Sequence, residues 1–202
     1  VETSFFQDIE IFGGIGASNY FGDIGGRDTT AGYTGAKAII DNLDIDFWQT
    51  RVALFGGARF TRWKSFALTA QLSPVFLSGS DYRSSYEKLG APGRPYEFKT
   101  TLVELSAIGE YYFAKRLTGF APYCSLGFSG MMFRYENSRN DKPKWDNGNT
   151  IILGLGMRFP SYHRITHSLD LSYHFTTTDY LDGFITNRNT KDMFMTLSYR
   201  IN

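Results

Sequence analysis

Eight segments of the 202-residue chain alternate large apolar residues with small or polar ones, and this period of two constrains the fold more than any other feature. The clearest segment is the last, in which the apolar positions are Met193, Met195, Leu197, Tyr199 and Ile201. A period of two places successive side chains on opposite faces, so each segment predicts a β-strand with one apolar face. The other segments begin near residues 9, 48, 66, 101, 120, 150 and 168.

The connections between these segments alternate in length. Those at residues 61–64, 113–118 and 160–165 are short, whereas those near residues 20–46, 79–97, 135–148 and 177–191 are long and rich in Gly, Asn and Asp. Short turns at one end and long loops at the other are typical of outer-membrane barrels, which have an even number of strands. We therefore predict one domain over residues 1–202, an all-β fold. It is an eight-stranded antiparallel transmembrane β-barrel with a filled lumen, short periplasmic turns and long extracellular loops.

Composition excludes several other classes. The net charge is +1, from 21 Lys+Arg against 20 Asp+Glu, which argues against a nucleic-acid-binding protein. No stretch approaches the roughly 18 apolar residues of a membrane-spanning helix. No secretory signal opens the chain, so we expect any such signal to have been removed before Val1.

The main structural competitor is a soluble eight-stranded barrel of the lipocalin kind. Its polar face would meet water and carry many charges, whereas the polar faces here are mostly Gly, Ala, Ser and Thr, which suit a narrow, filled interior. Aromatic residues also gather where the predicted strands meet turns: Trp48, Trp63, Tyr112, Phe113, Phe159, Tyr162 and Tyr199. Because amphipathic rings prefer membrane–water interfaces, we expect an integral protein of the bacterial outer membrane in contact with its lipids and lipopolysaccharide.

Charged residues on the polar faces are predicted to form a network inside the lumen. Those near the short turns alternate in sign around the barrel, and others lie further up: Glu10, Arg59, Glu110, Arg158, Asp170 and Arg200, then Arg51, Glu104 and His174. Eight strands leave room only for side chains, so we expect these charges to pair and plug the lumen. The functional alternative is a proton or ion path. A diffusion porin is disfavoured, because a water-filled channel needs about 16 strands.

We predict no enzymatic activity, no small-molecule substrate and no cofactor. His174-Phe175-Thr176 is distantly similar to the His-x-Ser pattern of the lipid A deacylase barrels, but it has Thr in place of Ser and lies on the inward face. His167 faces outward with no carboxylate on its face, so a catalytic triad is not expected. The single Cys124 excludes a multi-cysteine metal cluster. It faces outward, as an apolar filler or as a thiol open to an intermolecular disulfide.

The three short turns share basic chemistry, with cations beside aromatic residues. Their predicted partner-binding residues are Arg62, Trp63 and Lys64, then Lys115 and Arg116, then His163 and Arg164. This basic rim either anchors to phospholipid headgroups or docks a periplasmic partner with acidic patches. The long loops mix charges that suit lipopolysaccharide phosphates or protein ligands.

Residues 9–24 carry a resemblance to a known family. Gly16, Ser18, Tyr20, Gly22 and Asp23 match a G-x-S-x-Y-x-G-D pattern, and residues 198–202 also suit that group. On these residues the chain resembles the PorG-like small outer-membrane barrels of the type IX secretion system.

The resemblance implies a barrel that neither conducts nor catalyses and that anchors the periplasmic ring of the secretion machine, built from a lipoprotein and its partner. The basic rim would then be the docking surface, and Cys124 a candidate covalent link. The alternative function is a stand-alone surface barrel that stabilises the envelope or binds host or matrix through its long loops.

Overall fold

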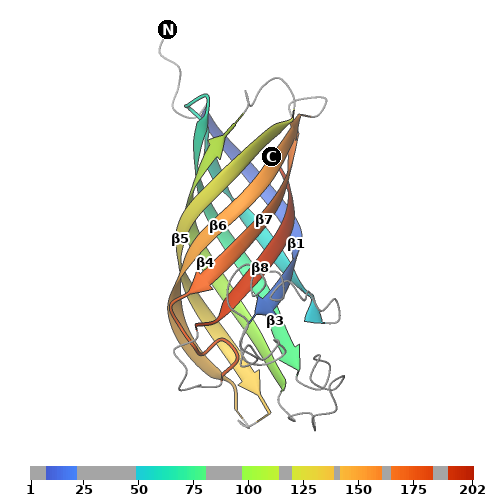
Figure 1. The fold of residues 1–202 in the computed structure, drawn as a ribbon, viewed down its shortest axis with the longest axis vertical. Helices are drawn as coiled ribbons and strands as arrows, with labels where there is room; N and C mark the ends of the chain where they lie inside the picture. Colours follow the sequence, from blue (N-terminus) through green and yellow to red (C-terminus); the bar gives the residue numbers. More distant parts are fainter. Residues whose placement is uncertain are drawn as a thin grey trace, which may run out of the picture.

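The computed structural model describes residues 8–21, 49–80, 97–113, 120–138, 142–160, 165–183 and 191–202. These residues form one closed antiparallel barrel in which each strand pairs with its neighbours in the chain (Figure 1). The strands are β1 (Ile9–Phe21), β2 (Arg51–Phe60), β3 (Phe66–Ser80), β4 (Glu97–Tyr112), β5 (Ala121–Asn137), β6 (Lys144–Pro160), β7 (Thr166–Thr176) and β8 (Met193–Ile201). The predicted eight-stranded antiparallel barrel is therefore confirmed.

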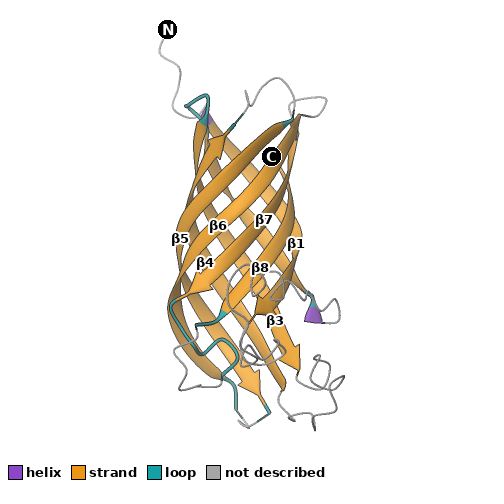
Figure 2. Cartoon of the chain, in the orientation of Figure 1, coloured by secondary structure: helices purple, strands orange, loops and turns teal. Residues whose placement is uncertain are grey.

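Strand accounts for almost all of the described chain (Figure 2). The barrel closes where β1 pairs with β8, from Gly13 opposite Ile201 to Phe21 opposite Met193. Closure matters because an open sheet would leave a row of unpaired backbone groups at each edge. None of the described residues belongs to a helix long and apolar enough to cross a bilayer.

Side chains alternate between the lumen and the outer wall along every strand. In β4, for example, Glu104 is fully buried while its neighbour Leu105 is 64% exposed. Large apolar side chains cover the outer wall, and Ile11, Leu126 and Leu155 are each more than 60% exposed. The inner faces carry most of the buried polar and charged residues, so the barrel is inverted relative to a soluble protein.

The strands differ in length, and the difference corrects one prediction. β3 to β6 have 15 to 17 residues, whereas β1, β2, β7 and β8 have 9 to 13. Figure 1 shows the longer strands extending past the shorter ones at the end with the long connections. The predicted long loop over residues 135–148 is wrong, because β5 continues to Asn137 and β6 begins at Lys144. Polar outward residues such as Arg134 and Glu136 conceal a strand whose inward partners, including Phe133, are buried.

Two glycines make room for rings inside the lumen. A Cβ on Gly57 would come within 2.9 Å of the Phe12 ring, and a Cβ on Gly16 within 2.9 Å of the Phe55 ring. A larger residue at either position would displace the ring or the wall. Phe12 and Phe55 lie next to the charged side chains described below, on the side that faces the long loops.

Candidate functional site

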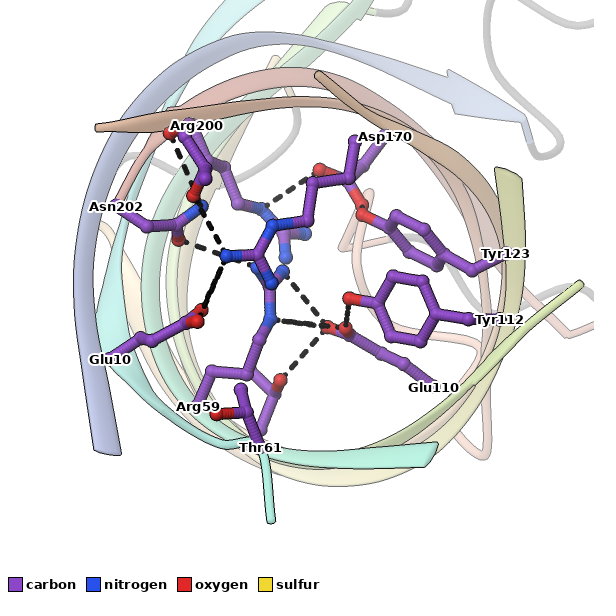
Figure 3. A network of polar contacts seen from close by, with 12 residues as sticks. Glu10, Arg59, Thr61, Glu110, Tyr112, Tyr123, Asp170, Arg200 and Asn202 are labelled. Carbon is purple, nitrogen blue, oxygen red and sulfur yellow. Dashed lines mark hydrogen bonds and ion pairs between the residues drawn. The ribbon is translucent and has the colours of Figure 1, made fainter. Parts of the chain in front are cut away.

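The end of the lumen beside the short turns, the short-turn end, is closed by paired charges (Figure 3). Arg59 from β2 and Glu110 from β4 form the central pair, with 3.0 Å between Arg59 Nε and Glu110 Oε2. Arg59 is fully buried and Glu110 is 1% exposed. The pair also shares hydrogen bonds of 3.1 and 3.2 Å from Arg59 Nη2 and Nε to Glu110 Oε1.

Neutral side chains complete the coordination of Glu110. The hydroxyl of Tyr112 donates to Glu110 Oε2 at 2.6 Å, and that of Thr69 donates to Oε1 at 2.8 Å. Tyr112 is 1% exposed, so its predicted place at the membrane interface is wrong. It shares the inward face of β4 with Glu110, two residues away, and alternation could have placed it there.

Two further pairs complete the layer. Arg158 of β6 reaches Glu10 of β1 at 2.8 Å, and Arg200 of β8 lies 3.4 Å from Asp170 of β7. The Arg200–Asp170 pair makes no hydrogen bond at this distance, so charge attraction holds it rather than a directed bond. Asp170 also accepts a hydrogen bond from the Tyr123 hydroxyl.

The three pairs balance three cations against three anions, so this charged layer is neutral. Aromatic rings cover the side of this layer that faces the long loops. The guanidinium of Arg200 lies 5.4 Å from the centre of the Phe12 ring and 5.6 Å from that of Phe55, and Arg59 lies 5.6 Å from Phe12. These are cation–π distances. The predicted inward ring of charges is therefore present as a packed plug.

Further from the short turns, inside the lumen, Glu104, His174 and Thr196 form a chain of contacts. His174 Nδ1 lies 3.2 Å from Glu104, and its Nε2 lies 3.3 Å from the Thr196 hydroxyl. The order of groups is that of a catalytic triad, but all three side chains are at most 2% exposed and His174 stacks on Phe194 at 4.2 Å. Thr176, the residue of the His-x-Thr pattern, donates instead to two backbone carbonyls. Within the described part of the chain, these groups are closed off from the surface.

Apolar side chains close the other end of the lumen, the loop end. They form one cluster of buried residues with Phe12 and Phe55: Tyr20, Ala53, Val75, Leu77, Phe98, Leu102, Met131, Phe133, Tyr135, Leu181 and Phe194. Leu181 is fully buried although it lies outside the strands. Its segment is held by Asn137, whose side-chain amide donates to the Gly183 carbonyl at 2.9 Å, and by a hydrogen bond from Thr100 to the Leu181 carbonyl.

Arg51 departs from the predicted lumen network. It is exposed at the loop end of β2, and its Nη1 donates to the Thr50 carbonyl at 3.1 Å. β2 begins at Arg51, so the side chain lies at the mouth of the barrel, where water can solvate it. Burial inside would have required a buried anion beside it.

The described part of the basic rim is the turn between β2 and β3. Arg62, Trp63 and Lys64 are all exposed, and the Trp63 ring packs against Phe60 at 5.4 Å and Phe66 at 5.7 Å. The remaining predicted rim residues lie outside the described residues: Lys115, Arg116, His163 and Arg164.

Cys124 lies on the outer wall as predicted, half-buried between Tyr111 of β4 and Leu155 of β6. Its thiol is free. Across the described ranges, no group of three or more His, Cys, Asp or Glu side chains is placed to hold a metal ion.

Comparison with known proteins finds similarity in fold alone. The structure resembles neisserial surface protein A, with a TM-score of 0.50 and 10% identity over 96% of this chain and 97% of that one. The N-terminal β-barrel domain of Pseudomonas aeruginosa OprF has a TM-score of 0.49 with 12% identity, and Yersinia pestis Ail has 0.49 with 11%. Each of these two covers 96% of both chains. No family model and no curated sequence matches the chain.

Proposed function

We propose that this protein is an integral outer-membrane barrel that neither conducts nor catalyses, and that it anchors a periplasmic ring complex of a type IX secretion machine. The observation that carries the proposal is the combination of a filled lumen with an apolar outer wall. Such a barrel can act only through its wall and its two rims. In the outer membrane, its outer wall contacts phospholipid in the inner leaflet and lipopolysaccharide in the outer leaflet.

The outer wall supports the membrane location. The apolar belt is bordered near the short turns by the exposed rings of Tyr111, Phe113 and Phe120. Tyr111 packs on Phe113 at 5.6 Å, and Phe120 packs on the half-buried Phe159 at 5.2 Å. Rings at this level suit the boundary between hydrocarbon and headgroups. A soluble barrel would have to expose the same wall to water and would aggregate.

The rim on the short-turn side supports the anchoring role. Trp63 is fixed by its ring contacts, which leaves Arg62 and Lys64 at the surface beside it. Exposed cations at a rim steer association with acidic partners more than they stabilise the barrel. The choice of a periplasmic lipoprotein as partner, and of Cys124 as a candidate covalent link to it, rests on the family resemblance.

Charge reversal tests this proposal. Barrels carrying Arg62→Glu, Lys64→Glu, Arg116→Glu and Arg164→Glu together would be purified from outer membranes in mild detergent, with and without reductant. We expect the wild type to retain a periplasmic lipoprotein in stoichiometric amount and the variant to lose it. A matched control reverses four exposed cations at the loop end, Lys99→Glu, Arg134→Glu, Lys142→Glu and Lys144→Glu, which changes the net charge by the same amount, and should retain the partner. Equal retention by the rim variant and the wild type would contradict the proposal.

A second candidate is supported by the loop end of the molecule. There β4 and β5 carry the exposed charged residues Glu97, Lys99, Arg134 and Glu136 beyond the apolar belt. Glu97, Lys99 and Glu136 line a hollow of about 250 Å³. A rigid sheet that stands above the membrane suits a surface barrel that binds proteins or matrix. Loss of the partner on the loop-end reversal, but not on rim reversal, would favour this candidate.

A further inference from the structure

The outer wall has a hollow near the loop end of the apolar belt. Its volume is about 390 Å³, and it is lined by outward side chains of β4, β5 and β6 with adjoining Met131 and Gly148. The outward residues are Val103, Leu105, Gly130, Met132, Asn147 and Asn149. This volume is within the roughly 300–1,000 Å³ of small-molecule sites.

One missing side chain creates the hollow. The strand register places Gly130 between Leu105 on β4 and Asn149 on β6. Its outward neighbours along β5 are Phe128 and Met132, which are 58% and 63% exposed. A Cβ on Gly130 would meet only Asn149 Oδ1, at 4.0 Å. The wall is therefore large and apolar around a gap that a side chain could occupy without a clash.

The hollow is apolar toward the middle of the belt and polar toward the loop end. The row of paired residues below it is Ala107, Phe128 and Ile151, whereas Asn149 and Asn147 replace apolar residues on β6 at the level of the hollow. Neither amide side chain has a hydrogen-bond partner in the described part of the chain. Arg134, one step further up β5, pairs with Glu136 at 2.9 Å. Among the described residues, the hollow thus presents two amide side chains without a hydrogen-bond partner, while Arg134, which does not line it, is paired with Glu136.

We propose that this hollow binds a saccharolipid of the outer leaflet, with one acyl chain against Gly130 and the amide or hydroxyl groups of its sugar on Asn147 and Asn149. The inference rests on the proposed outer-membrane location. The hollow opens onto the apolar belt, and an empty hollow would forfeit the dispersion contacts of its lining, so a hydrocarbon chain is the occupant that fits. Neutral amides both donate to and accept from sugar hydroxyl and amide groups, which suits a sugar better than an isolated phosphate.

The test uses two probes, lipid A and phosphatidylethanolamine, each titrated into delipidated barrel in detergent and counted by native mass spectrometry. We expect the wild type to retain one lipid A molecule. Gly130→Leu should retain lipid A at least about tenfold less, because the new side chain occupies the space of several methylene groups. Gly56→Leu is the matched control. Gly56 also faces outward, on β2, and nothing lies within 4 Å of its Cβ, so retention should equal that of the wild type.

The headgroup is tested separately with Asn147→Ala and Asn149→Ala combined. This variant should retain less lipid A while its weaker retention of phosphatidylethanolamine stays unchanged. Equal retention of lipid A by the wild type and Gly130→Leu would overturn the site, and equal retention of the two lipids by the wild type would overturn the sugar assignment. Outer-membrane fractionation and the heat-dependent gel mobility of the wild type test the membrane location independently, so its failure is distinguishable from failure of the lipid site.

Discussion

At the short-turn end of the lumen, Arg59 and Glu110 lie in a neutral layer of ion pairs and hydrogen bonds. At the loop end apolar side chains such as Phe133 and Leu181 predominate, beside the buried Asp192, which accepts hydrogen bonds from the Tyr20 hydroxyl and the Leu181 amide. Both arrangements fill a narrow barrel with side chains. Their energetics differ, because an apolar contact is non-directional while a buried charge is costly without its partner. We infer that the charged layer contributes register and specificity, and that the apolar layer contributes net stability.

The largest effect is expected from Glu110→Ala. It leaves Arg59 buried without its anion and also removes the acceptor of Tyr112 and Thr69. The free energy of unfolding should fall by about 3–5 kcal/mol. Urea unfolding in lipid vesicles measures it. The double variant Arg59→Met with Glu110→Met removes both charges and should recover most of the loss. A double variant as unstable as Glu110→Ala would contradict the description of this layer as a matched pair.

Leu181→Ala tests the apolar layer at the other end and should be less damaging. It removes a fully buried side chain but leaves the strands paired. We expect a loss of about 2–3 kcal/mol, the lower part of the range for buried leucines, because the segment around it can partly collapse into the space. The loss should be independent of salt concentration. A strong dependence on salt would show that the two ends do not differ in the way described.

Glu10→Gln sharpens the comparison within the charged layer itself. The Glu10 side chain is 30% exposed, whereas Glu110 is 1% exposed. Water screens the Glu10 side of this pair, but Arg158 is only 6% exposed and would lose its anion. The cost should therefore lie below that of Glu110→Ala, at about 1–3 kcal/mol, and added salt should reduce it. A loss as large as that of Glu110→Ala would mean that burial does not set the strength of these pairs.

The smallest effect on stability is expected from Arg62→Glu with Lys64→Glu on the rim. Both residues are exposed, so the free energy of unfolding should change by no more than about 0.5 kcal/mol. The same variant is expected to weaken capture of the partner. A large loss of stability would show that these cations serve the barrel itself.

The period of two predicts most of this architecture, since it identifies all eight strands and the inward direction of residues such as Glu10, Arg59 and Arg200. It fails where composition and pattern conflict. The polar outward residues of β5 beyond Met132 resemble a loop, although the strand continues as far as Asn137. Leu181 lies outside any strand, so no periodicity could place it in the lumen; only the three-dimensional packing does.

The alternation along each strand predicts which way a charged side chain points, but not which opposite charge it pairs with. The pairing of Arg59 with Glu110 joins strands β2 and β4, which are not adjacent in the sheet, and depends on side-chain reach across the lumen. Arg51 shows that an inward direction does not by itself bury a side chain. The alternation places it on the inward face, but it lies at the loop end of β2, where it is exposed to water. The direction of a side chain follows from the local sequence. Its position along the barrel axis, and the partner that it contacts, depend on the closed barrel.

The most direct test of the sealed lumen is the ionic conductance of the purified barrel in a planar lipid bilayer. Correct insertion is checked beforehand by the gel mobility of the folded form. Two closed ends predict a current no larger than that of the bare bilayer at any applied voltage. Discrete, reproducible channel openings from the wild-type barrel would contradict the account and would point to an ion path through the charged layer.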